Sequence, residues 1–295
     1  MHVPVLLREV IQHLQLSPGL RVVDGTLGAG GHSREIFKKI GDTGELLGFD
    51  RDPMMLAHAT KAVSGSNVVL HHGSYVELGD LLERRAIETG SSRQVDRILL
   101  DLGYSSDQLA DRTRGFSFQE DGPLDLRFST GEGLSAADCL AQADEAAIIH
   151  ALQTYGEEPN ALRLGPVLAQ AARAGKLRTT SDLVHTVESS IPAAQLRSAE
   201  KHPATRVFQA LRIQVNAELE HVERMLGEIA PAALAPSGLL AVITFHSLED
   251  RLAKLAFKQT DIWEELTPKP IAPTPAEVRF NPRSRSAKLR VARRR

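Results

Sequence analysis

Three clusters of polar residues hold the side chains best suited to chemistry, and each cluster directly follows a short apolar run. The first spans Asp24 to His32 and contains four glycines, the second spans Asp101 to Gln108, and the third spans His246 to Arg251. Acids, serines and histidines in such positions can hold a charged ligand, accept a proton or orient a second substrate. If the three clusters converge, they form the kind of centre that a bisubstrate transferase needs.

The glycine-rich stretch VVDGTLGAGGHS, residues 22–33, is predicted to be a turn between a strand over 21–24 and a helix over 32–40. Glycine lets the backbone approach a ligand closely, and the start of a helix aims free N–H groups at it. A second predicted strand ends in Asp50, twenty residues after Gly30. In folds of this kind an acid at that distance binds a ribose diol.

Two classes of nucleotide-like ligand use such a turn. A dinucleotide-binding turn reads G-x-G-x-x-G/A, but the sequence from Gly28 reads GAGGHS, with Ser33 in the last place. Enzymes that use S-adenosylmethionine prefer an acid at the strand end and glycines two, four and six residues later, and here Asp24 is followed by Thr26, Gly28 and Gly30. The acid can attract the ammonium of this cofactor, which has no pyrophosphate to bind. The pattern favours S-adenosylmethionine, and a tight turn that binds no ligand is the alternative.

The elements that must position these clusters alternate along the chain. Helical segments such as 53–63 separate the first strands, and this alternation predicts an α/β fold with a parallel sheet and helices on both faces. Open sheets of this kind bind ligands at the carboxyl ends of their strands, where all three clusters lie. The predicted strands are 21–24, 45–50, 67–72, 95–102, 238–245 and, as a possible last one, 287–294.

The alternation stops after Leu102, and no convincing strand follows before about His202. Segments 135–156 and 160–175 are predicted to be helical, so we expect a helical domain inserted into the sheet domain. A long helix with an apolar stripe from Phe208 to Ile229 is expected to return the chain to the sheet, and the proline-rich segment 267–278 to be an extended connector. The predicted domains are residues 1–106 and 203–295 for the sheet and 107–202 for the insertion.

Charge is distributed unevenly along the chain. The formal net charge is −2, but residues 268–295 hold nine Lys and Arg against one acid, Glu277, so this stretch carries +8 and the remainder −10. Such a stretch either contacts a polyanion or is a solvated tail. With a single cysteine, Cys139, we predict no intrachain disulfide and no thiolate cluster for zinc. We assign no metal ligand, and whether a metal ion assists the reaction stays open. No signal segment or membrane span is apparent, so we expect a cytoplasmic protein.

Asp101 and Tyr104, in the segment DLGY, match the spacing of a motif that enzymes methylating exocyclic amino groups carry after their fourth strand, although the two prolines of that motif are missing. Ten motifs in order, from His2 to about Arg294, then resemble one bacterial family closely, the 16S rRNA cytosine-N4 methyltransferases RsmH, also called MraW. The motifs are HVPVLLREV, DGTLGAGGHS, FDRDP, LLDLG.SS.QL, RGFSF, DGPLDLR, YGEE, KHPATRVFQALRIQVNAELE, FHSLEDR and NPRSRSAKLR.

This resemblance implies an S-adenosyl-L-methionine-dependent methyltransferase with a Rossmann-like sheet and an inserted helical domain that recognises substrate. The implied substrate is a decoding-centre cytidine of 16S rRNA in the small ribosomal subunit, while the choice between monomer and homodimer stays open. Position 75 is often Phe in the family and position 104 is usually aliphatic, so we do not assign catalysis to the Tyr104 hydroxyl. The cofactor contacts that the resemblance implies are Gly30, Gly31, His32, Asp50, Tyr75, Asp101 and Gln108.

Asp101 is the first candidate for the group that accepts a hydrogen bond from the substrate amino group, with Ser105, Ser106 and His246 as possible helpers. Alternatively, Asp101 only binds cofactor and His246 is a structural residue. Two other functions also stay open: a methyltransferase acting on amino groups of DNA or a small molecule, and a ribosome-assembly factor that binds rRNA without catalysis.

Overall fold

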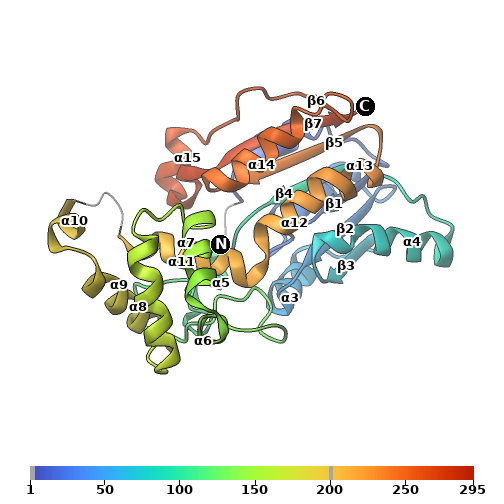
Figure 1. Ribbon diagram of the computed structural model, residues 1–295. Coiled ribbons are helices and arrows are strands. Elements are labelled where there is room, and N and C mark those ends of the chain that lie inside the picture. Colours follow the sequence, from blue (N-terminus) through green and yellow to red (C-terminus); the bar gives the residue numbers. More distant parts are fainter. Residues whose placement is uncertain (1–3, 199–201) are drawn as a thin grey trace. The chain divides into compact units, whose positions relative to one another are not determined.

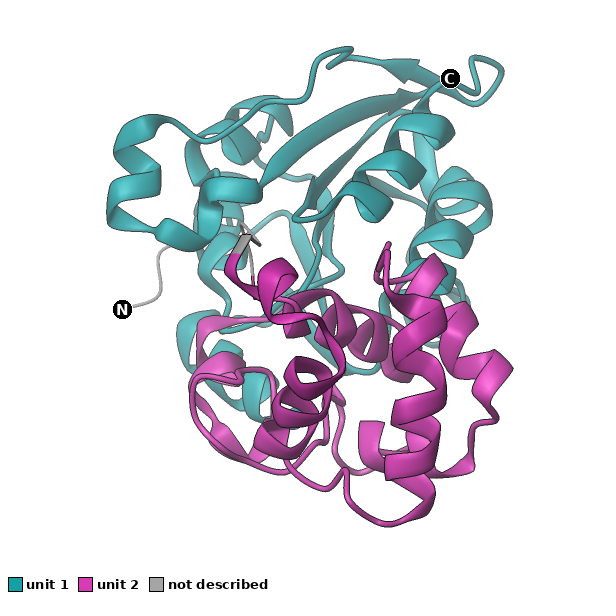
Figure 2. Ribbon diagram, turned by 60° about the vertical axis from the view of Figure 1, so that its left-hand side comes forward, with its two compact units in different colours: residues 1–103, 219–295 teal, residues 104–218 magenta. Residues whose placement is uncertain are grey.

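The structure, a computed structural model, describes residues 4–198 and 202–295, and the chain forms two compact units. One unit comprises Met1–Gly103 and Leu219–Arg295, and the other comprises Tyr104–Glu218 (Figure 2). None of the helices in the described ranges is long and apolar enough to cross a membrane.

The first unit is built on a seven-stranded sheet with strand order β3-β2-β1-β4-β5-β7-β6. Neighbouring strands from β3 to β5 are parallel, whereas β7 pairs antiparallel with both β5 and β6. The order reverses between β1 and β4, which places a ligand-binding crevice of an open α/β sheet beyond their carboxyl ends. The strands, visible in Figure 1, are β1 (Arg21–Asp24), β2 (Glu45–Asp50), β3 (Val68–His72), β4 (Val95–Asp101), β5 (Leu234–Thr244), β6 (Trp263–Glu265) and β7 (Lys288–Arg294).

Helices cover both faces of this sheet because successive strand residues point to opposite faces. Val22 belongs to a core with helices α1 and α2, whereas its neighbour Val23 belongs to a core with α4, α12 and α14. Strands buried on both faces must be apolar throughout, which explains their continuous hydrophobic runs. The helices of this unit are α1 (Leu7–His13), α2 (Gly31–Ile40), α3 (Pro53–Ala62), η1 (Tyr75–Glu77), α4 (Leu78–Thr89), α12 (Glu218–Arg224), η3 (Met225–Ile229), α13 (Ala230–Ala233), α14 (Ser247–Phe257), α15 (Pro275–Phe280) and η4 (Pro282–Ser286).

The second unit is helical and has its own core, formed by apolar residues between Phe116 and Leu211. Helix α8 packs against both α7 and α9 in this core. The helices of the unit are α5 (Ser106–Ala110), η2 (Arg112–Arg114), α6 (Ala136–Gln142), α7 (Glu145–Thr154), α8 (Ala161–Arg173), α9 (Thr180–Ser190), α10 (Ala193–Ser198) and α11 (Ala204–Asn216).

The predicted α/β fold with a helical insertion is confirmed. All six predicted strands are present, two with the predicted limits and four with limits that differ by at most four residues, and the insertion holds no strand in its described part. Strand β6 is missing from the prediction because its three residues are too few to show a period. The proline-rich segment 267–278 is not wholly extended, since α15 begins at Pro275.

The prediction of one long helix after Pro203 is wrong. Ala217 has a left-handed backbone, with φ 51°, and this residue ends α11 before α12 begins. The apolar stripe is therefore shared between two cores: Phe208 and Leu211 pack in the helical unit, and Val222 and Leu226 pack against the sheet. For the same reason, the second junction between the compact units lies after Glu218 and not after residue 202. The first junction lies after Gly103, which moves Ser105 and Ser106 from the predicted sheet domain into the helical unit.

Candidate functional site

The glycine loop connects β1 to α2 and takes backbone conformations that favour glycine. Gly28 and Gly30 have φ values of 52° and 80°, in the left-handed region. A Cβ on Gly31 would lie 2.6 Å from Cγ of Pro4, so close packing excludes a side chain there. A Cβ on Gly28 would meet nothing within 4 Å, so this part of the loop borders open space that a ligand can enter.

Asp24, the last residue of β1, is 1% exposed and holds the loop together. Its carboxylate accepts hydrogen bonds from Ser33 Oγ at 2.6 Å and from the Thr26 backbone N–H at 3.2 Å. Burial raises the pKa of Asp24 to about 6 despite these hydrogen bonds. Ser33, the residue that breaks the dinucleotide pattern, is thus the partner of the acid that the S-adenosylmethionine pattern requires.

Asp50 connects the end of β2 to the same loop. Its Oδ2 accepts a hydrogen bond from the Gly28 N–H and its Oδ1 accepts one from the Asp52 N–H, both at 2.8 Å. Burial raises the pKa of Asp50 to about 6. Each carboxylate oxygen keeps further acceptor capacity, which suits it to a ribose diol. Tyr75, which follows β3, is 9% exposed, and its ring makes an edge contact with His221 at a centroid distance of 6.2 Å.

Asp101 at the end of β4 has the least satisfied carboxylate of the site. Its backbone N–H donates to Thr26 Oγ1 at 2.5 Å, and its Oδ2 lies 3.5 Å from His32 Nδ1. Its Oδ1 is buried and has no hydrogen-bond partner among the described residues. Burial, with the nearby carboxylates of Asp24 and Glu249, raises the pKa of Asp101 well above its usual range. An unpartnered buried acceptor of this kind points to a group that the bound state supplies.

The His32 ring is oriented by the N-terminal segment. Nε2 lies 2.9 Å from the carbonyl oxygen of Val5, and a carbonyl can only accept, so Nε2 carries a hydrogen. In neutral His32 the Nδ1 lone pair then faces Asp101 Oδ2. These two side chains can hold one proton between them.

These features of the sheet unit fit S-adenosyl-L-methionine. Asp24, Asp50 and Asp101 end three strands at one edge of the sheet, and β1 and β4 flank the point at which the strand order reverses. The open side of Gly28 and the unpartnered Asp101 Oδ1 leave both space and an acceptor for a bound molecule. Sequence reasoning missed the positioning roles of Thr26 and Glu249, since a hydroxyl two residues or an acid five residues after a strand end carries no distinctive pattern.

The predicted residues Ser105, Ser106 and Gln108 lie in the helical unit and have structural partners there. Ser105 caps α5: its Oγ accepts from the Gln108 N–H at 3.1 Å, and Gln108 Oε1 accepts from the Ser105 N–H at 2.9 Å. Ser106 is the first residue of that helix. The Tyr104 ring stacks on Phe116 at a centroid distance of 5.2 Å.

His246 is the N-cap of α14 and lies in the sheet unit. Its partner Glu249 is 1% exposed and accepts from the Phe245 N–H at 2.8 Å, and His246 Nε2 lies 3.1 Å from Glu249 Oε1. The reciprocal pair fixes the turn after β5. This geometry supplies the structural role that the sequence left open for His246, and a part in catalysis stays a prediction.

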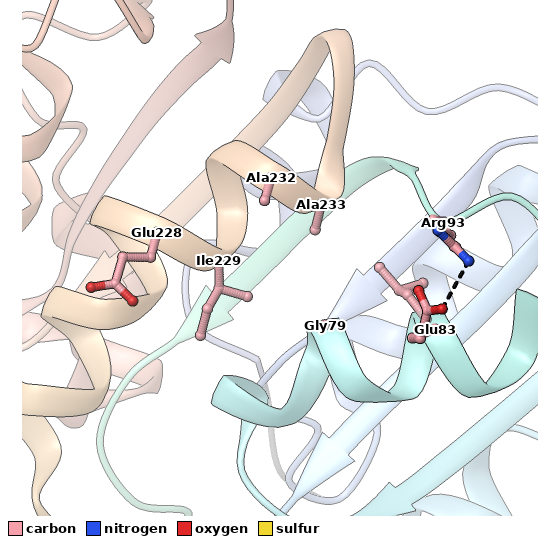
Figure 3. A pocket seen from close by; sticks show the side chains of 8 residues that line it. Gly79, Glu83, Arg93, Glu228, Ile229, Ala232 and Ala233 are labelled. Carbon is pink, nitrogen blue, oxygen red and sulfur yellow. Dashed lines mark hydrogen bonds and ion pairs between the residues drawn. The ribbon is translucent and has the colours of Figure 1, made fainter.

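A cavity of about 260 Å³ lies elsewhere, between helix α4 and the segment η3–α13 (Figure 3). The Glu83 carboxylate and the Arg93 guanidinium pair at 2.8 Å on its wall. None of the residues predicted for cofactor binding or catalysis lines it. The lining residues are Gly79, Leu82, Glu83, Arg93, Glu228, Ile229, Ala232 and Ala233.

Comparison with known proteins gives consistent matches over the whole chain. The sequence profile of the MraW methylase family matches residues 1–295. The ribosomal RNA small subunit methyltransferase H of Sorangium cellulosum is 44% identical over 296 residues, which cover 99% of this chain and 90% of that protein. The protein of the same name from Nitrosococcus oceani is 43% identical over 311 residues, which cover 99% of this chain and 96% of that protein.

Proposed function

Because the chain belongs to the MraW methylase family, an S-adenosyl-L-methionine-dependent methyltransferase family, we propose that it methylates the exocyclic N4 of a decoding-centre cytidine in 16S rRNA. The names of its relatives support a small-subunit rRNA substrate. The motifs shared with the cytosine-N4 enzymes support the choice of atom and site. A substrate on the ribosome would place the protein in the cytoplasm.

The observation that carries this proposal is the unpartnered Oδ1 of Asp101 at the end of β4. The amino nitrogen of cytosine is a weak nucleophile because its lone pair is delocalised into the ring. A carboxylate that accepts a hydrogen bond from the amino group localises this lone pair. Asp101 then accepts the proton that the nitrogen loses after methyl transfer, and its raised pKa makes its carboxylate a stronger base than an ordinary aspartate.

His32 assists this step by holding Asp101 in place. The Nδ1 lone pair of neutral His32 faces Asp101 Oδ2 at 3.5 Å, so a proton gained by Asp101 can be shared with the ring. The hydrogen bond to the Val5 carbonyl keeps the ring in this orientation. His32 is therefore a positioning residue for the proton acceptor.

The remaining site residues would bind the cofactor, which supplies an electrophilic methyl group. Asp24 at the end of β1 offers a negative charge to its ammonium, Asp50 accepts from its ribose, and Tyr75 borders its adenine. Gly28 and its neighbours let the backbone approach. Alignment of the two reacting atoms is the main task left to the protein, and in favourable cases such alignment lowers a barrier by about 7–11 kcal/mol.

We assign recognition of the RNA to the helical insertion and to basic residues of the C-terminal stretch. The target cytidine must be turned out of its stack, because the amino group of a stacked, paired base is not accessible to the cofactor. Ser106 and Gln108 lie in α5, the first helix of the insertion, and Ser105 is its N-cap; we propose that the two serines assist catalysis and that Gln108 contacts the cofactor.

The test is methyl transfer from radiolabelled cofactor to small ribosomal subunits that lack the modification, followed by mapping of the labelled nucleotide. Label on N4 of one decoding-centre cytidine is expected, and Asp101→Asn should abolish most of it while cofactor binding persists. Label on DNA or a small amine in place of rRNA would indicate a different amino-methyltransferase. Tight binding to the subunit with no transfer by the wild-type protein would indicate an assembly factor.

A further inference from the structure

The nine basic residues of segment 268–295 divide into two groups once their partners are known. Those of β7, with Arg295 directly after it, are engaged by the protein itself. Lys288 and Arg290 both pair with Asp250, at 2.8 and 2.7 Å, and Arg293 pairs with Glu264 at 3.0 Å. Arg294 and Arg295 donate to backbone carbonyls of Pro231 and Trp263. These side chains stabilise the edge of the sheet, so they are poorly placed to recognise an external anion.

The second group lies before β7 and comprises Lys269, Arg279, Arg283 and Arg285, of which Arg283 is half-buried and has an interaction of its own. Lys269, Arg279 and Arg285 are exposed, and none of them has an ion pair or side-chain hydrogen bond within the part of the chain that the structure describes. Two of the three, Arg279 and Arg285, lie in or next to helix α15 and turn η4, a segment of twelve residues from Pro275 to Ser286. Within residues 268–295, the exposed cations without a protein partner are therefore found mainly on one short segment.

This segment also exposes an aromatic ring. Phe280, the last residue of α15, is 88% exposed, more than any other large hydrophobic side chain in the described ranges. Leaving a phenylalanine in water forgoes the free energy of its burial. A ring directly after Arg279 and five residues before Arg285 combines the two features that single-stranded nucleic acid requires, a stacking surface and cations for the backbone.

The segment is held firmly to the sheet unit. The Thr274 hydroxyl caps α15 by accepting from the Glu277 N–H at 3.1 Å, and Glu277 Oε1 accepts from the Leu6 N–H at 2.7 Å. Ser284 is fully buried, and its hydroxyl donates to the Asn281 carbonyl at 2.8 Å. Phe280 is thus presented on a fixed scaffold, which lowers the conformational entropy lost on binding.

We propose that residues 275–286 form a contact surface for a single-stranded segment of the RNA substrate, with Phe280 stacking on an unpaired base and Arg279 and Arg285 contacting phosphates. This inference rests on the proposed rRNA substrate. A second copy of the chain is a less suitable occupant. In a two-fold dimer the same patch meets itself, which would bring like-charged arginines together.

The experiment measures the affinity of the full-length protein for small ribosomal subunits and for a single-stranded RNA oligonucleotide, for the wild type and for Phe280→Ala, Phe280→Trp and Phe280→Leu. Loss of one stacked base should weaken RNA binding about fivefold or more in Phe280→Ala. Phe280→Trp should retain wild-type affinity, whereas Phe280→Leu should not, because leucine lacks a stacking face. Ile87→Ala is the matched control, since Ile87 is also an exposed apolar residue, at 74%.

The two arginines are tested by a salt series. Arg279→Gln with Arg285→Gln should reduce the slope of log affinity against log salt by about 1.4, which is about 0.7 for each contact to single-stranded RNA. Lys254→Gln with Lys258→Gln, on exposed side chains at the end of α14, controls for the change of two charges. Circular dichroism and cofactor affinity should be unchanged in every variant.

Equal RNA affinity of Phe280→Ala and wild type would overturn the inference. So would a fall in molecular mass on sedimentation of Phe280→Ala with unchanged RNA binding, because it would assign the ring to a contact between copies of the chain. Methyl transfer by the wild type is measured in parallel. If the wild type methylates the subunits and Phe280→Ala binds them equally well, only this inference fails, whereas absence of transfer by the wild type contradicts the proposed function.

Discussion

The substitution Asp24→Asn is expected to stabilise the folded protein and to weaken its cofactor binding. Burial raises the pKa of Asp24 from 3.8 to about 6, so its carboxylate is less favourable in the folded state than in the unfolded state. This shift corresponds to about 3 kcal/mol at a pH above both values. Asparagine removes the buried charge, and its amide can still bond to Ser33 Oγ and to the Thr26 N–H.

The gain in stability must depend on pH in a defined direction. Below pH 3.8 Asp24 is protonated in both the folded and the unfolded state, so its burial involves no charge and wild-type stability is not reduced. As the pH rises through 3.8 the unfolded chain loses this proton first, so wild-type stability falls until the pH passes about 6. The variant should therefore exceed the wild type by about 0.6 kcal/mol at pH 4, about 1.6 at pH 5 and about 3 at pH 8.

Urea unfolding followed by tryptophan fluorescence measures this difference directly. The single tryptophan, Trp263, is fully buried in the core of the sheet unit and reports on the unit that contains Asp24. Asp42→Asn, on an exposed acid, is the control and should change stability by less than about 0.5 kcal/mol at every pH. A stability difference that stays constant from pH 4 to pH 8 would refute the assignment of the buried charge. Unchanged affinity for S-adenosylmethionine would refute the role of that charge at the cofactor ammonium.

Three further outcomes are expected. Asp50→Ala should weaken cofactor binding at least about tenfold in calorimetry, since it removes the ribose acceptor and the acceptor for the Gly28 N–H, and equal affinity in a folded variant would contradict this role. Wild-type turnover should rise with pH, because only the carboxylate form of Asp101 accepts a proton and its pKa lies above the usual range, whereas Asp101→Asn should be slow and independent of pH. Asp250→Ala should lower the free energy of unfolding by about 3 kcal/mol in urea, because Arg290 is 3% exposed and would lose its partner at 2.7 Å, keeping only the longer ion pair with Glu265 at 3.7 Å.

The sheet and its ligand-binding edge could be predicted from sequence because both depend on local patterns. A strand buried on two faces must be apolar along its buried length, so segments such as 239–243 are recognisable without any knowledge of their neighbours. Glycines that follow such a run are needed for left-handed backbone at Gly28 and Gly30. The acids Asp24 and Asp50 stand at fixed distances from that turn, so the pattern contains most of the cofactor half of the site.

The end of helix α11 could not be predicted in this way. Ala217 is a strong helix former with a left-handed backbone, so its conformation is imposed by packing on either side and not by its own preference. The apolar spacing continues through it because both α11 and α12 bury a face, although in different cores. Periodicity detects that a face is buried, but it does not identify which core buries it.

A count of charges along the sequence also does not show which charges are already paired within the protein. The pairs seen in the structure change where an RNA contact should be sought. The sequence assigns +8 to residues 268–295, yet the last strand and Arg295, which follows it, account for five of the nine cations, and each of those five has a protein partner. Deleting the last three arginines would therefore remove part of β7, and a resulting loss of RNA binding would not distinguish a phosphate contact from local unfolding. Arg279 and Arg285 have no ion pair among the described residues, and Phe280 is 88% exposed, so substituting them should leave the fold intact. A loss of RNA affinity in these variants can therefore be assigned to a lost contact with the RNA.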